Sequence, residues 1–435
     1  MIERLKGRFE KAAEIAKCHD RIHLFSHYDA DGIASASVVA SSLRRSGIEF
    51  NVTIFPTLEP KQMEKVRDTE FECMIMTDMG TSYLNELGEL GKDCIILDHH
   101  EPLTDTDLNH VAYINCHNAG IDGSHEVCAS TMAYLFAQAM GDNKDLVEIA
   151  IAGMIGDKQH IGGFKGVNKG VIDSAIEDGR IICQDDSLIP SGDITHSLYE
   201  SIDPFIKGIS GDITGVKELL ASLNIVDLSD QIEKKRLEYE VLGRLRSQGV
   251  SNHIIDQCIQ PRYHLPTYGM DAERLSRIID ACGRSEKGDA GIELCLDGKS
   301  PIAESTYMKY TERLLRCADD LSKNGTIVME NIQFFINTVS GVTGTVAGMY
   351  SRYLGDPMKP IVGFQPEGKK YSLSSRCTDL ALDRGVNMAT AMRECTRAVG
   401  GNGGGHANAA GGSIHKEKKD EFLMLLNETI GKQIS

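Results

Sequence analysis

Short apolar runs alternate with helical patterns along the first third of the chain. The runs with strand character cover residues 21–26, 50–55, 71–77, 94–97 and 111–115. A stretch rich in small residues, 32–45, has helical spacing and lies between the first two runs. Strands that alternate with helices predict a mostly parallel sheet with helices on both faces. In such a sheet the binding crevice lies beyond the carboxyl ends of the strands.

The rest of the chain shows a helical section and then a second α/β pattern. From about residue 193 to 248 the spacing is helical, and the charged stretch SDQIEKKRLEYEVLGRLRSQG is followed by the loop-like PRYHLPTYG. After residue 325 the strand candidates are TIVME, IQFFIN, PIVGF and KYSLSS, with helices expected over 345–354 and 387–399. We therefore expect an N-terminal α/β domain at residues 1–190, a mainly helical connector or insertion at 191–310, and a smaller C-terminal α/β domain at 311–435.

The composition is that of an ordinary globular protein with an acidic balance. The chain has 435 residues, of which 41% are hydrophobic and 25% charged. Lys and Arg number 46 against 63 Asp and Glu, which gives a net charge of −17. This balance argues against a protein that coats nucleic acid by bulk attraction, so a polyanion would have to be met locally, by bound cations or a basic groove.

Two further features bear on the compartment. The N-terminal stretch has helical spacing among charges and lacks the apolar core of a signal peptide, and no apolar run approaches the roughly 18 residues that span a bilayer. We therefore expect a cytoplasmic protein with no membrane association. The twelve cysteines are scattered without a C-x-x-C pair, which favours buried free thiols over disulfides or zinc ligands.

Polar clusters follow three of the predicted strands and one helical stretch, VEIAIAGMIG. Their side chains are those of His27, Asp29, Asp31, Asp78, Asp98, His99, His100 and Asp157. Because the fold places strand ends at one rim, we expect these side chains to lie close together. Carboxylates packed side by side repel one another unless cations neutralise them. A mixed histidine and carboxylate set suits manganese or a similar first-row ion, and one carboxylate can bridge two ions about 3.5–4 Å apart.

The clusters HYDADGIAS, TDMG, DHH and GMIGD resemble, in this order, the four motifs of the DHH phosphoesterases. The first motif is most similar to that of RecJ-type exonucleases, particularly the archaeal RecJ-like proteins. The resemblance implies two bound divalent ions, Mn²⁺ or alternatively Mg²⁺. The implied ligands of one ion are His27, Asp29 and Asp78, and those of the other are Asp31, Asp78, His99 and Asp157, with Asp78 as the bridge. The resemblance also implies that His100 faces the substrate phosphate and that Asp98 orients an imidazole.

Two C-terminal stretches, SLSSRC and GNGGGHANAAGG, look like the DHH-associated domain, whose glycine-rich loop and neighbouring arginine hold a nucleic-acid backbone. Glycines let backbone N–H groups approach a phosphate closely, and His or Arg adds charge-assisted hydrogen bonds. The candidate contacts are Ser375, Arg376, Gly403, Gly404, Gly405, His406 and Asn408. Arg284, in DACGR, also resembles a RecJ-type segment. The alternatives are a flexible linker for the glycine cluster and a structural salt bridge for Arg284.

The resemblance implies a metal-dependent phosphodiesterase that acts as a single-strand exonuclease in DNA replication or repair. A crevice between two α/β domains would suit a threaded single strand better than a duplex. Digestion of DNA from 5′ to 3′ and of RNA from 3′ to 5′ are both compatible with the resemblance. A second interpretation is an oligoribonuclease or cyclic-dinucleotide phosphodiesterase, although such proteins lack a long helical section. A third is a replisome subunit associated with the GINS complex.

Overall fold

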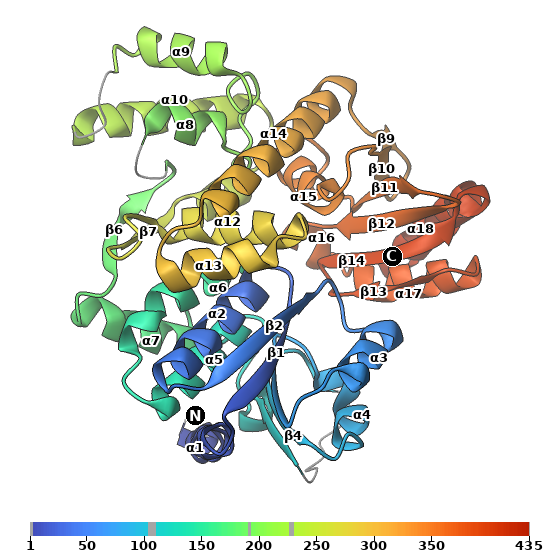
Figure 1. Ribbon diagram of the computed structural model, residues 1–435. Coiled ribbons are helices and arrows are strands. Elements are labelled where there is room, and N and C mark those ends of the chain that lie inside the picture. The colour runs from blue at the N-terminus through green and yellow to red at the C-terminus, as the bar shows by residue number, and fades with distance from the viewer. Residues whose placement is uncertain (1–2, 103–109, 190–192, 226–229, 435) are drawn as a thin grey trace. The chain divides into compact units, whose positions relative to one another are not determined.

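The chain forms two compact units. The computed structural model describes residues 3–102, 110–189, 193–225 and 230–434 (Figure 1). The first unit comprises Met1–Ser191 and Gln260–Lys309, and the second comprises Gly192–Ile259 and Tyr310–Ser435. The chain therefore leaves the first unit after Ser191, returns to it at Gln260 and leaves it again after Lys309. This arrangement divides the connector expected at residues 191–310 between the two units.

The first unit is built on a five-stranded parallel sheet in the order β2-β1-β3-β4-β5. Its strands are β1 (Arg21–His27), β2 (Glu49–Phe55), β3 (Cys73–Thr77), β4 (Asp93–Asp98) and β5 (Val111–Asn115), which confirms the five strands expected. The chain runs outward from β1 to β2 and then continues on the other side of β1 at β3. The carboxyl ends of β1 and β3 therefore form the topological switch point at which α/β sheets bind ligands.

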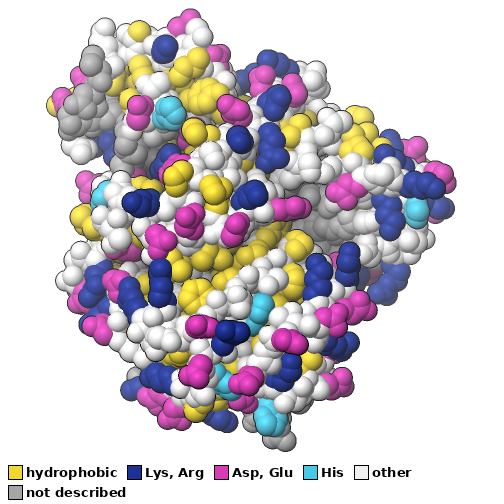
Figure 2. Space-filling model, in the orientation of Figure 1, with side chains coloured by type: hydrophobic (Ala, Val, Ile, Leu, Met, Phe, Trp, Pro, Cys, Tyr) yellow, Lys and Arg dark blue, Asp and Glu magenta, His cyan; other side chains and the backbone are white. Residues whose placement is uncertain are grey.

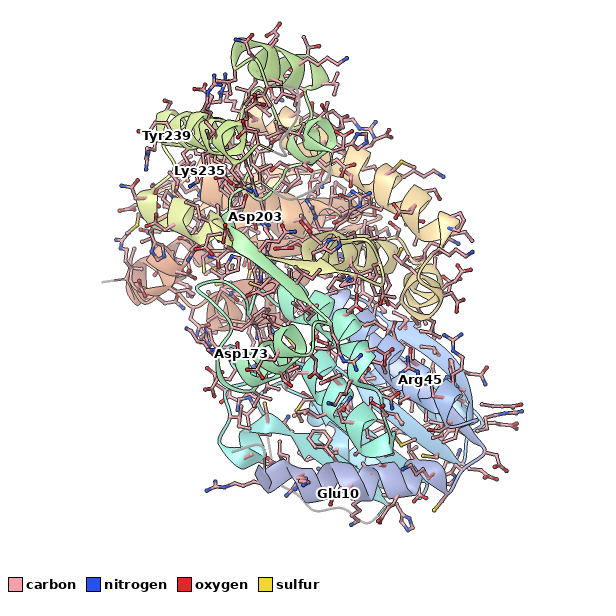
Figure 3. The ribbon with its side chains drawn as sticks, turned by 90° about the vertical axis from the view of Figure 1, so that its left-hand side faces the viewer. Glu10, Arg45, Asp173, Asp203, Lys235 and Tyr239 are labelled. Carbon is pink, nitrogen blue, oxygen red and sulfur yellow. The ribbon has the colours of Figure 1, made fainter. Side chains whose placement is uncertain are left out.

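Helices cover both faces of this sheet, because β3 is buried at every position and needs apolar partners on both sides. On one face, α3 (Pro60–Asp68) and α4 (Leu84–Gly88) pack on a core that includes Phe25, Met74 and Met76. The other face carries α1 (Glu3–Lys17), α2 (Ala30–Arg45) and α5 (Ala129–Met140), with α6 (Val147–Gly156) against α2 and α5. A further helix, α7 (Gly166–Glu177), contacts α5 and α6. At the end of α2, Arg45, which is labelled in Figure 3, pairs with Asp145 at 2.5 Å.

A small antiparallel sheet lies where the chain leaves and re-enters the first unit. It consists of β6 (Ile182–Ser187), β7 (Gln260–Leu265) and β8 (Met270–Asp271). The prediction of a loop at PRYHLPTYG is therefore wrong for its first half, which is strand β7. The local sequence lacks this signal because the pairing partner, β6, is distant in the chain. Arg262 of β7 donates to the carbonyls of Ser187 and Leu188 and pairs with the buried Glu273 at 3.1 Å.

Two helices that follow β8 belong to the first unit and not to a separate insertion. α12 (Ala272–Arg284) contacts α2 and α6, and α13 (Gly288–Asp297) contacts α2 and α12. The approach of α12 depends on Gly283, because a Cβ atom there would lie only 1.5 Å from the carbonyl oxygen of Tyr28. The glycine of DACGR thus allows α12 to pack directly beside the HYDAD segment. The long α14 (Pro301–Asn324) contains the boundary between the two units.

The second unit contains a six-stranded sheet in the order β13-β14-β12-β11-β10-β9. Its strands are β9 (Ile327–Val328), β10 (Gln333–Ile336), β11 (Ile361–Glu367), β12 (Lys370–Arg376), β13 (Asn402–Gly405) and β14 (Ala409–His415). The core includes Phe364, Phe422 and Met392, from β11, α18 (Lys419–Gln433) and α17 (Met388–Ala398). α15 (Thr343–Tyr353) contacts β11 and β12. The predicted strands and helices after residue 325 are thus present.

The remaining helices of the second unit are short or highly charged. They are α8 (Ile194–Tyr199), α9 (Ile213–Ser222), α10 (Gln231–Ser247), α11 (Asn252–Cys258) and α16 (Asp379–Leu382). Figure 3 shows Lys235 and Tyr239 on α10, and the side chain of Tyr239 is 78% exposed. The helical prediction for residues 193–248 agrees with α8, α9 and α10, whereas residues 200–212 between α8 and α9 form turns and irregular structure.

Acidic and basic side chains are interspersed on the face shown in Figure 2 and do not form one continuous basic surface there. All twelve cysteines are unpaired thiols, and nine of them are buried. Among the described residues, no helix combines the length and the apolar composition that crossing a bilayer requires.

Candidate metal centre

The first predicted ligands lie in the tight connection between β1 and α2. His27 is the last residue of β1, Asp29 is the N-cap of α2, and Asp31 lies in its first turn. Asp29 Oδ1 accepts a hydrogen bond from the Gly32 N–H at 3.0 Å, which starts the helix. A Cβ atom at Gly32 would lie 2.3 Å from the His27 carbonyl oxygen. Glycine at this position therefore lets the three ligand side chains follow one another over a single turn.

Asp78 lies between two imidazoles at the centre of the cluster. It follows β3 with a left-handed φ of 59°, and its N–H donates to the Leu97 carbonyl at 3.0 Å. Its Oδ2 is 3.3 Å from His27 Nδ1, and its Oδ1 is 3.2 Å from His99 Nε2. Asp29 Oδ2 also lies 2.9 Å from His27 Nδ1. One oxygen of Asp78 thus faces each half of the cluster, which is the geometry that a bridging carboxylate needs.

The second half of the cluster brings together Asp31, His99 and Asp157. His99 Nε2 lies 3.9 Å from Asp31 Oδ2 and 3.5 Å from Asp157 Oδ2. The Asp31 oxygens accept from the backbone N–H groups of Ala129 and Ser130 at 2.7 and 2.9 Å, so the N-terminus of α5 holds this carboxylate. Asp157 caps α6, and its buried Oδ2 has no hydrogen-bond partner within the described residues. A buried oxygen of this kind fits a cation ligand.

Each imidazole directs one ring nitrogen toward the carboxylates of the cluster, because a carbonyl holds the opposite nitrogen. His99 Nδ1 lies 2.7 Å from the Gly123 carbonyl oxygen, and His27 Nε2 lies 3.1 Å from that of Pro56. A carbonyl only accepts hydrogen bonds, so these nitrogens donate and the others face the carboxylates. Gln159 donates to the same Gly123 carbonyl at 2.9 Å. Sequence reasoning missed Gly123 and Gln159, which lie outside the four motifs.

Asp98 and His100 form a pair at the edge of the cluster. Asp98 accepts hydrogen bonds from the Thr81, His99 and His100 N–H groups at 2.8–3.2 Å and from His100 Nδ1 at 2.7 Å. Burial raises the pKa of Asp98, but the charge and hydrogen bond of His100, the charge of His99 and the hydrogen bond from Thr81 together outweigh burial, and the pKa lies well below its usual range. Burial also lowers the pKa of His100, and Asp98 outweighs this and raises it to about 9. His100 is therefore a cation near neutral pH, and its side chain is 38% exposed.

The carboxylates and imidazoles compete for protons inside the cluster. Burial and then the charge of Asp78 raise the pKa of Asp31 to about 6. Burial and then Asp31 raise the pKa of Asp157 well above its usual value. Burial lowers the pKa values of His27 and His99, but the neighbouring carboxylates outweigh burial and raise them. Divalent cations bound among these side chains would offset the same repulsion and displace these protons.

Three groups of potential ligand atoms, each group within 4.8 Å, occur in the described residues. They are His27, Asp29 and Asp78; Asp78, His99 and His100; and Asp31, Cys128 and Asp157. All six predicted metal ligands are in these groups. Cys128 was missed, because its place in an apolar stretch predicts only a buried thiol. Burial and then the charges of Asp31 and Asp157 raise the pKa of this thiol.

Arg284 lies beside the cluster in the last turn of α12. Its Nη1 is 3.4 Å from the Tyr28 hydroxyl, its guanidinium lies 5.5 Å from the centre of the Tyr28 ring, and its Nε pairs with Asp280 at 2.6 Å. The salt-bridge alternative is thus realised within α12. Burial raises the pKa of Asp29, but the charge of His27, the hydrogen bonds from His27 and Gly32 and, last, the charge of Arg284 together outweigh burial and lower this pKa. Arg284 therefore adds positive charge to the rim of the metal centre.

Two family models match parts of this chain. The description "DHH family, N-terminal domain" matches residues 21–156, and "DHHA1 domain" matches residues 331–432; together they cover more than half of the chain. This chain belongs to the DHH superfamily of phosphoesterases. Members of the superfamily hydrolyse phosphoester bonds, and the mixed α/β architecture described above is that of the DHH and DHHA1 domains.

The chain is similar to one full-length relative in sequence and to several solved structures in fold. An uncharacterised protein of Methanocaldococcus jannaschii is 29% identical over the full length of both chains. The RecJ structure from Thermus thermophilus, solved with Mn²⁺, has a TM-score of 0.61 at 15% identity and covers 98% of this chain. This chain spans only 55% of that RecJ. CDC45 from Entamoeba histolytica has a TM-score of 0.62 at 13% identity and covers 99% of this chain and 98% of its own.

In the DHHA1 domain, the glycine-rich segment is a pair of strands and not the loop that we expected. Gly403, Gly404 and Gly405 lie in β13 and pair with β14. A Cβ atom at Gly403 would lie 2.8 Å from Thr396 Oγ1 of α17, whereas Gly404 has open space. Gly405 has a φ of 136°, which favours glycine. Sheet pairing and packing on α17 therefore account for Gly403 and Gly405, and Gly404 leaves room for an approaching ligand.

The other predicted nucleic-acid contacts have different exposures. His406 and Asn408 are exposed in the turn between β13 and β14. Arg376 is half-buried at the end of β12, and its Nη2 lies near the start of α15, 2.8 Å from where a Cβ of Gly344 would be. Ser375 is fully buried, and its hydroxyl donates to the Ala410 carbonyl at 2.9 Å. Ser375 thus links β12 to β14 inside the domain.

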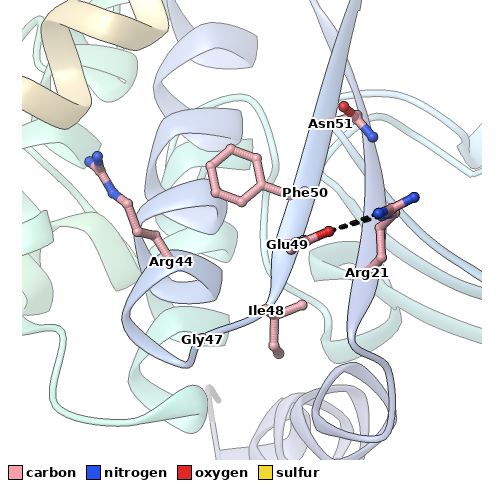
Figure 4. Close-up of a pocket in the computed structure, with 7 residues that line it drawn as sticks. All are labelled: Arg21, Arg44, Gly47, Ile48, Glu49, Phe50 and Asn51. Atoms are coloured by element: carbon pink, nitrogen blue, oxygen red, sulfur yellow. Dashed lines mark hydrogen bonds and ion pairs between the residues drawn. The ribbon is translucent and has the colours of Figure 1, made fainter.

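A surface hollow of about 580 Å³ in the DHH domain is unrelated to the metal centre (Figure 4). It lies at the opposite end of β1 and β2 and is lined by Arg44, Phe50 and the Arg21–Glu49 ion pair of 2.8 Å. None of the three groups of potential metal ligands includes a residue of its lining.

Proposed function

We propose that this chain is a divalent-cation-dependent phosphodiesterase that degrades single-stranded DNA or RNA from an end, as RecJ-type exonucleases do. In this proposal the chain binds two divalent ions, which are Mn²⁺ or Mg²⁺. The observation that carries the proposal is the position of Asp78, whose two oxygens face His27 and His99 at 3.3 and 3.2 Å. Structures of the RecJ from Thermus thermophilus with Mn²⁺ and with Mg²⁺ support a requirement for divalent ions.

Some residues of the cluster would bind the cations, and others would bind the substrate phosphate. His27, Asp29 and Asp78 would hold one cation, and Asp31, Asp78, His99 and Asp157 would hold the other. Bound divalent cations supply Lewis-acid chemistry, which activates water and offsets charge on the phosphate. His100, kept protonated by Asp98, donates a hydrogen bond to a phosphate oxygen. Arg284 adds a second cation on the same rim.

The test is digestion of oligonucleotides labelled at either end. Single-stranded DNA, single-stranded RNA and blunt duplex are incubated with Mn²⁺, Mg²⁺ or a chelator. We expect stepwise shortening of single strands with a divalent ion and none with the chelator, and the labelled end identifies the polarity. Asp78→Asn should abolish the activity, whereas Asp142→Asn, at an exposed aspartate of the same domain, should not. Digestion that persists in the Asp78→Asn protein, or after removal of all metal, would refute the proposal.

A small-substrate phosphodiesterase is the enzymatic alternative. The same metal centre would cleave a dinucleotide or a cyclic dinucleotide. Comparing turnover of a dinucleotide with that of a long oligonucleotide separates the two, because a polymer exonuclease acts faster on the long strand. Faster turnover of the dinucleotide would favour the alternative.

A replisome subunit is the second candidate function, and the match to CDC45 over nearly the whole of both chains favours it. In this function the chain associates with the GINS complex. Pull-down of purified GINS by the wild-type chain and by an Asp78→Ala variant tests it. Binding by both proteins would show that association does not need an intact metal centre, and no binding by either would refute this candidate.

A further inference from the structure

The Cys128 thiol lies beside the carboxylates that face His99. One oxygen of Asp31, one oxygen of Asp157 and the Cys128 sulfur all lie within 4.8 Å of one another. His99 Nε2 is 3.9 Å from Asp31 Oδ2 and 3.5 Å from Asp157 Oδ2. The Cys128 sulfur is therefore grouped, at the start of α5, with the two carboxylates that lie within 4 Å of His99 Nε2.

Packing alone gives Cys128 an ordinary role. Its sulfur lies 3.1 Å from Ser130 Oγ and 3.4 Å from Thr131 Oγ1, both in the first turn of α5, and the side chain is fully buried. A thiol that only fills space at a helix start would need no other neighbour. Among the described residues, however, this is the thiol that shares a group of potential metal ligands with carboxylates.

Two observations indicate that a ligand belongs at this place. Asp157 Oδ2 is buried and has no hydrogen-bond partner within the described residues, although it faces His99. The Asp31 carboxylate is held by two backbone N–H groups at 2.7 and 2.9 Å, so its position does not depend on Asp157 or on Cys128. A cation would satisfy the buried oxygen and draw all four donors together.

We propose that Cys128 is a ligand of the cation position formed by Asp31, His99 and Asp157. The sulfur makes this position suitable for thiophilic ions such as Zn²⁺ and Co²⁺. The inference rests on the proposed function, since it concerns the same metal centre. Zinc takes nitrogen, oxygen and sulfur ligands in a tetrahedral arrangement, whereas Mg²⁺ takes oxygen ligands in an octahedral one. Coordination replaces the S–H bond by a sulfur–cation bond and releases the proton to solvent.

The test is Co²⁺ titration of the full chain. The exposed Cys18 and Cys183 are first changed to serine, so that surface thiols do not bind the ion. Near-ultraviolet absorption then reports charge transfer from sulfur to cobalt. We expect this band in the background protein, its loss when C128S is added, and its retention when C258S is added, because Cys258 is a buried thiol of the second unit. Excess Zn²⁺ should abolish the band, and excess Mg²⁺ should leave it.

Several outcomes distinguish this inference from the proposed function. A band of equal intensity in the C128S protein would overturn the role of Cys128. Mn²⁺ binding is measured separately from the loss of the paramagnetic resonance signal of free Mn²⁺. Mn²⁺ binding by the background protein without a cobalt–sulfur band refutes the sulfur ligand alone, and absence of both refutes the metal centre. If circular dichroism shows that C128S does not fold, cadmium-113 NMR of the background protein replaces it, and a resonance typical of oxygen and nitrogen ligands overturns the inference.

Discussion

The most direct structural test of the metal centre is the Gly153→Ala substitution, which adds one methyl group. This glycine lies in α6 where the helix crosses the start of α5 and the Asp31 carboxylate. A Cβ atom there would lie 2.3 Å from Ser130 Oγ, 2.5 Å from Asp31 Oδ1 and 2.6 Å from Ser130 Cβ. Ordinary contact begins at 3.4 Å, so Gly153→Ala must move the carboxylate and α6 apart by about 1 Å. The neighbours are held by the helix termini and have little freedom to retreat.

A displacement of this size should have two measurable effects, one on stability and one on Mn²⁺ affinity. Overpacking a buried site typically costs about 1–3 kcal/mol, and each kcal/mol lowers Tm by about 2–4 °C for a unit of some 200 residues. Metal ligands must be held within about 0.5 Å of their working positions, so we also expect Mn²⁺ affinity to fall by about 10–100-fold, as when a group that orients a ligand is lost.

Differential scanning fluorimetry and Mn²⁺ titration measure the two effects on one preparation. Gly170→Ala is the matched control, because Gly170 is an exposed glycine inside α7 with no atom within 4 Å of its added Cβ. Alanine there should keep Mn²⁺ affinity and stabilise the protein by about 0.5–1 kcal/mol. If the Gly153→Ala protein kept the wild-type Tm and the wild-type Mn²⁺ affinity, the close packing of α6 against Asp31 and Ser130 would be contradicted.

Three other predictions concern charges. In an Asp98→Asn protein, the pKa of His100 should fall from about 9 toward its ordinary value of 6.5, because the negative partner is lost while burial remains; NMR titration of the metal-free protein checks this, and an unchanged pKa contradicts it. Mn²⁺ affinity should fall as the pH is lowered, because the raised pKa values of the two cluster imidazoles let protons compete; calorimetry that finds no proton release at acidic pH would contradict this. Arg262→Ala should lower the free energy of unfolding by about 3–5 kcal/mol, since it leaves the buried Glu273 carboxylate unpaired. Arg21→Ala, at the exposed ion pair with Glu49, should lower it by less than about 1 kcal/mol. Chemical denaturation measures both, and equal losses would contradict the importance of the buried pair.

Local pattern alone was enough to predict the sheet of the first unit and the place of the side chains that are its candidate metal ligands. The strands β1 to β5 are apolar runs of strand length, and burial on both faces makes such runs visible without knowledge of their partners. His27, Asp78 and Asp98 follow or end these strands, so a parallel sheet brings them to one edge. Resemblance to the DHH motifs then supplied the roles that we propose for Asp29, Asp31 and their neighbours.

Only the tertiary structure showed which distant segments complete these elements. β7 is a strand because β6 pairs with it, and Gly403 lies in a strand because it pairs with β14. Glycine is required at residue 403 because α17 and β14 leave no room for a side chain. Cys128 and Gln159 reach the metal centre through the placement of α5 and α6. The sequence by itself determined which runs are buried and where the strands end, because apolar runs and the polar residues that follow them are visible along the chain. Hydrogen-bond partners and distances between ligand atoms depend on segments that meet only after folding, so only the tertiary structure decided them.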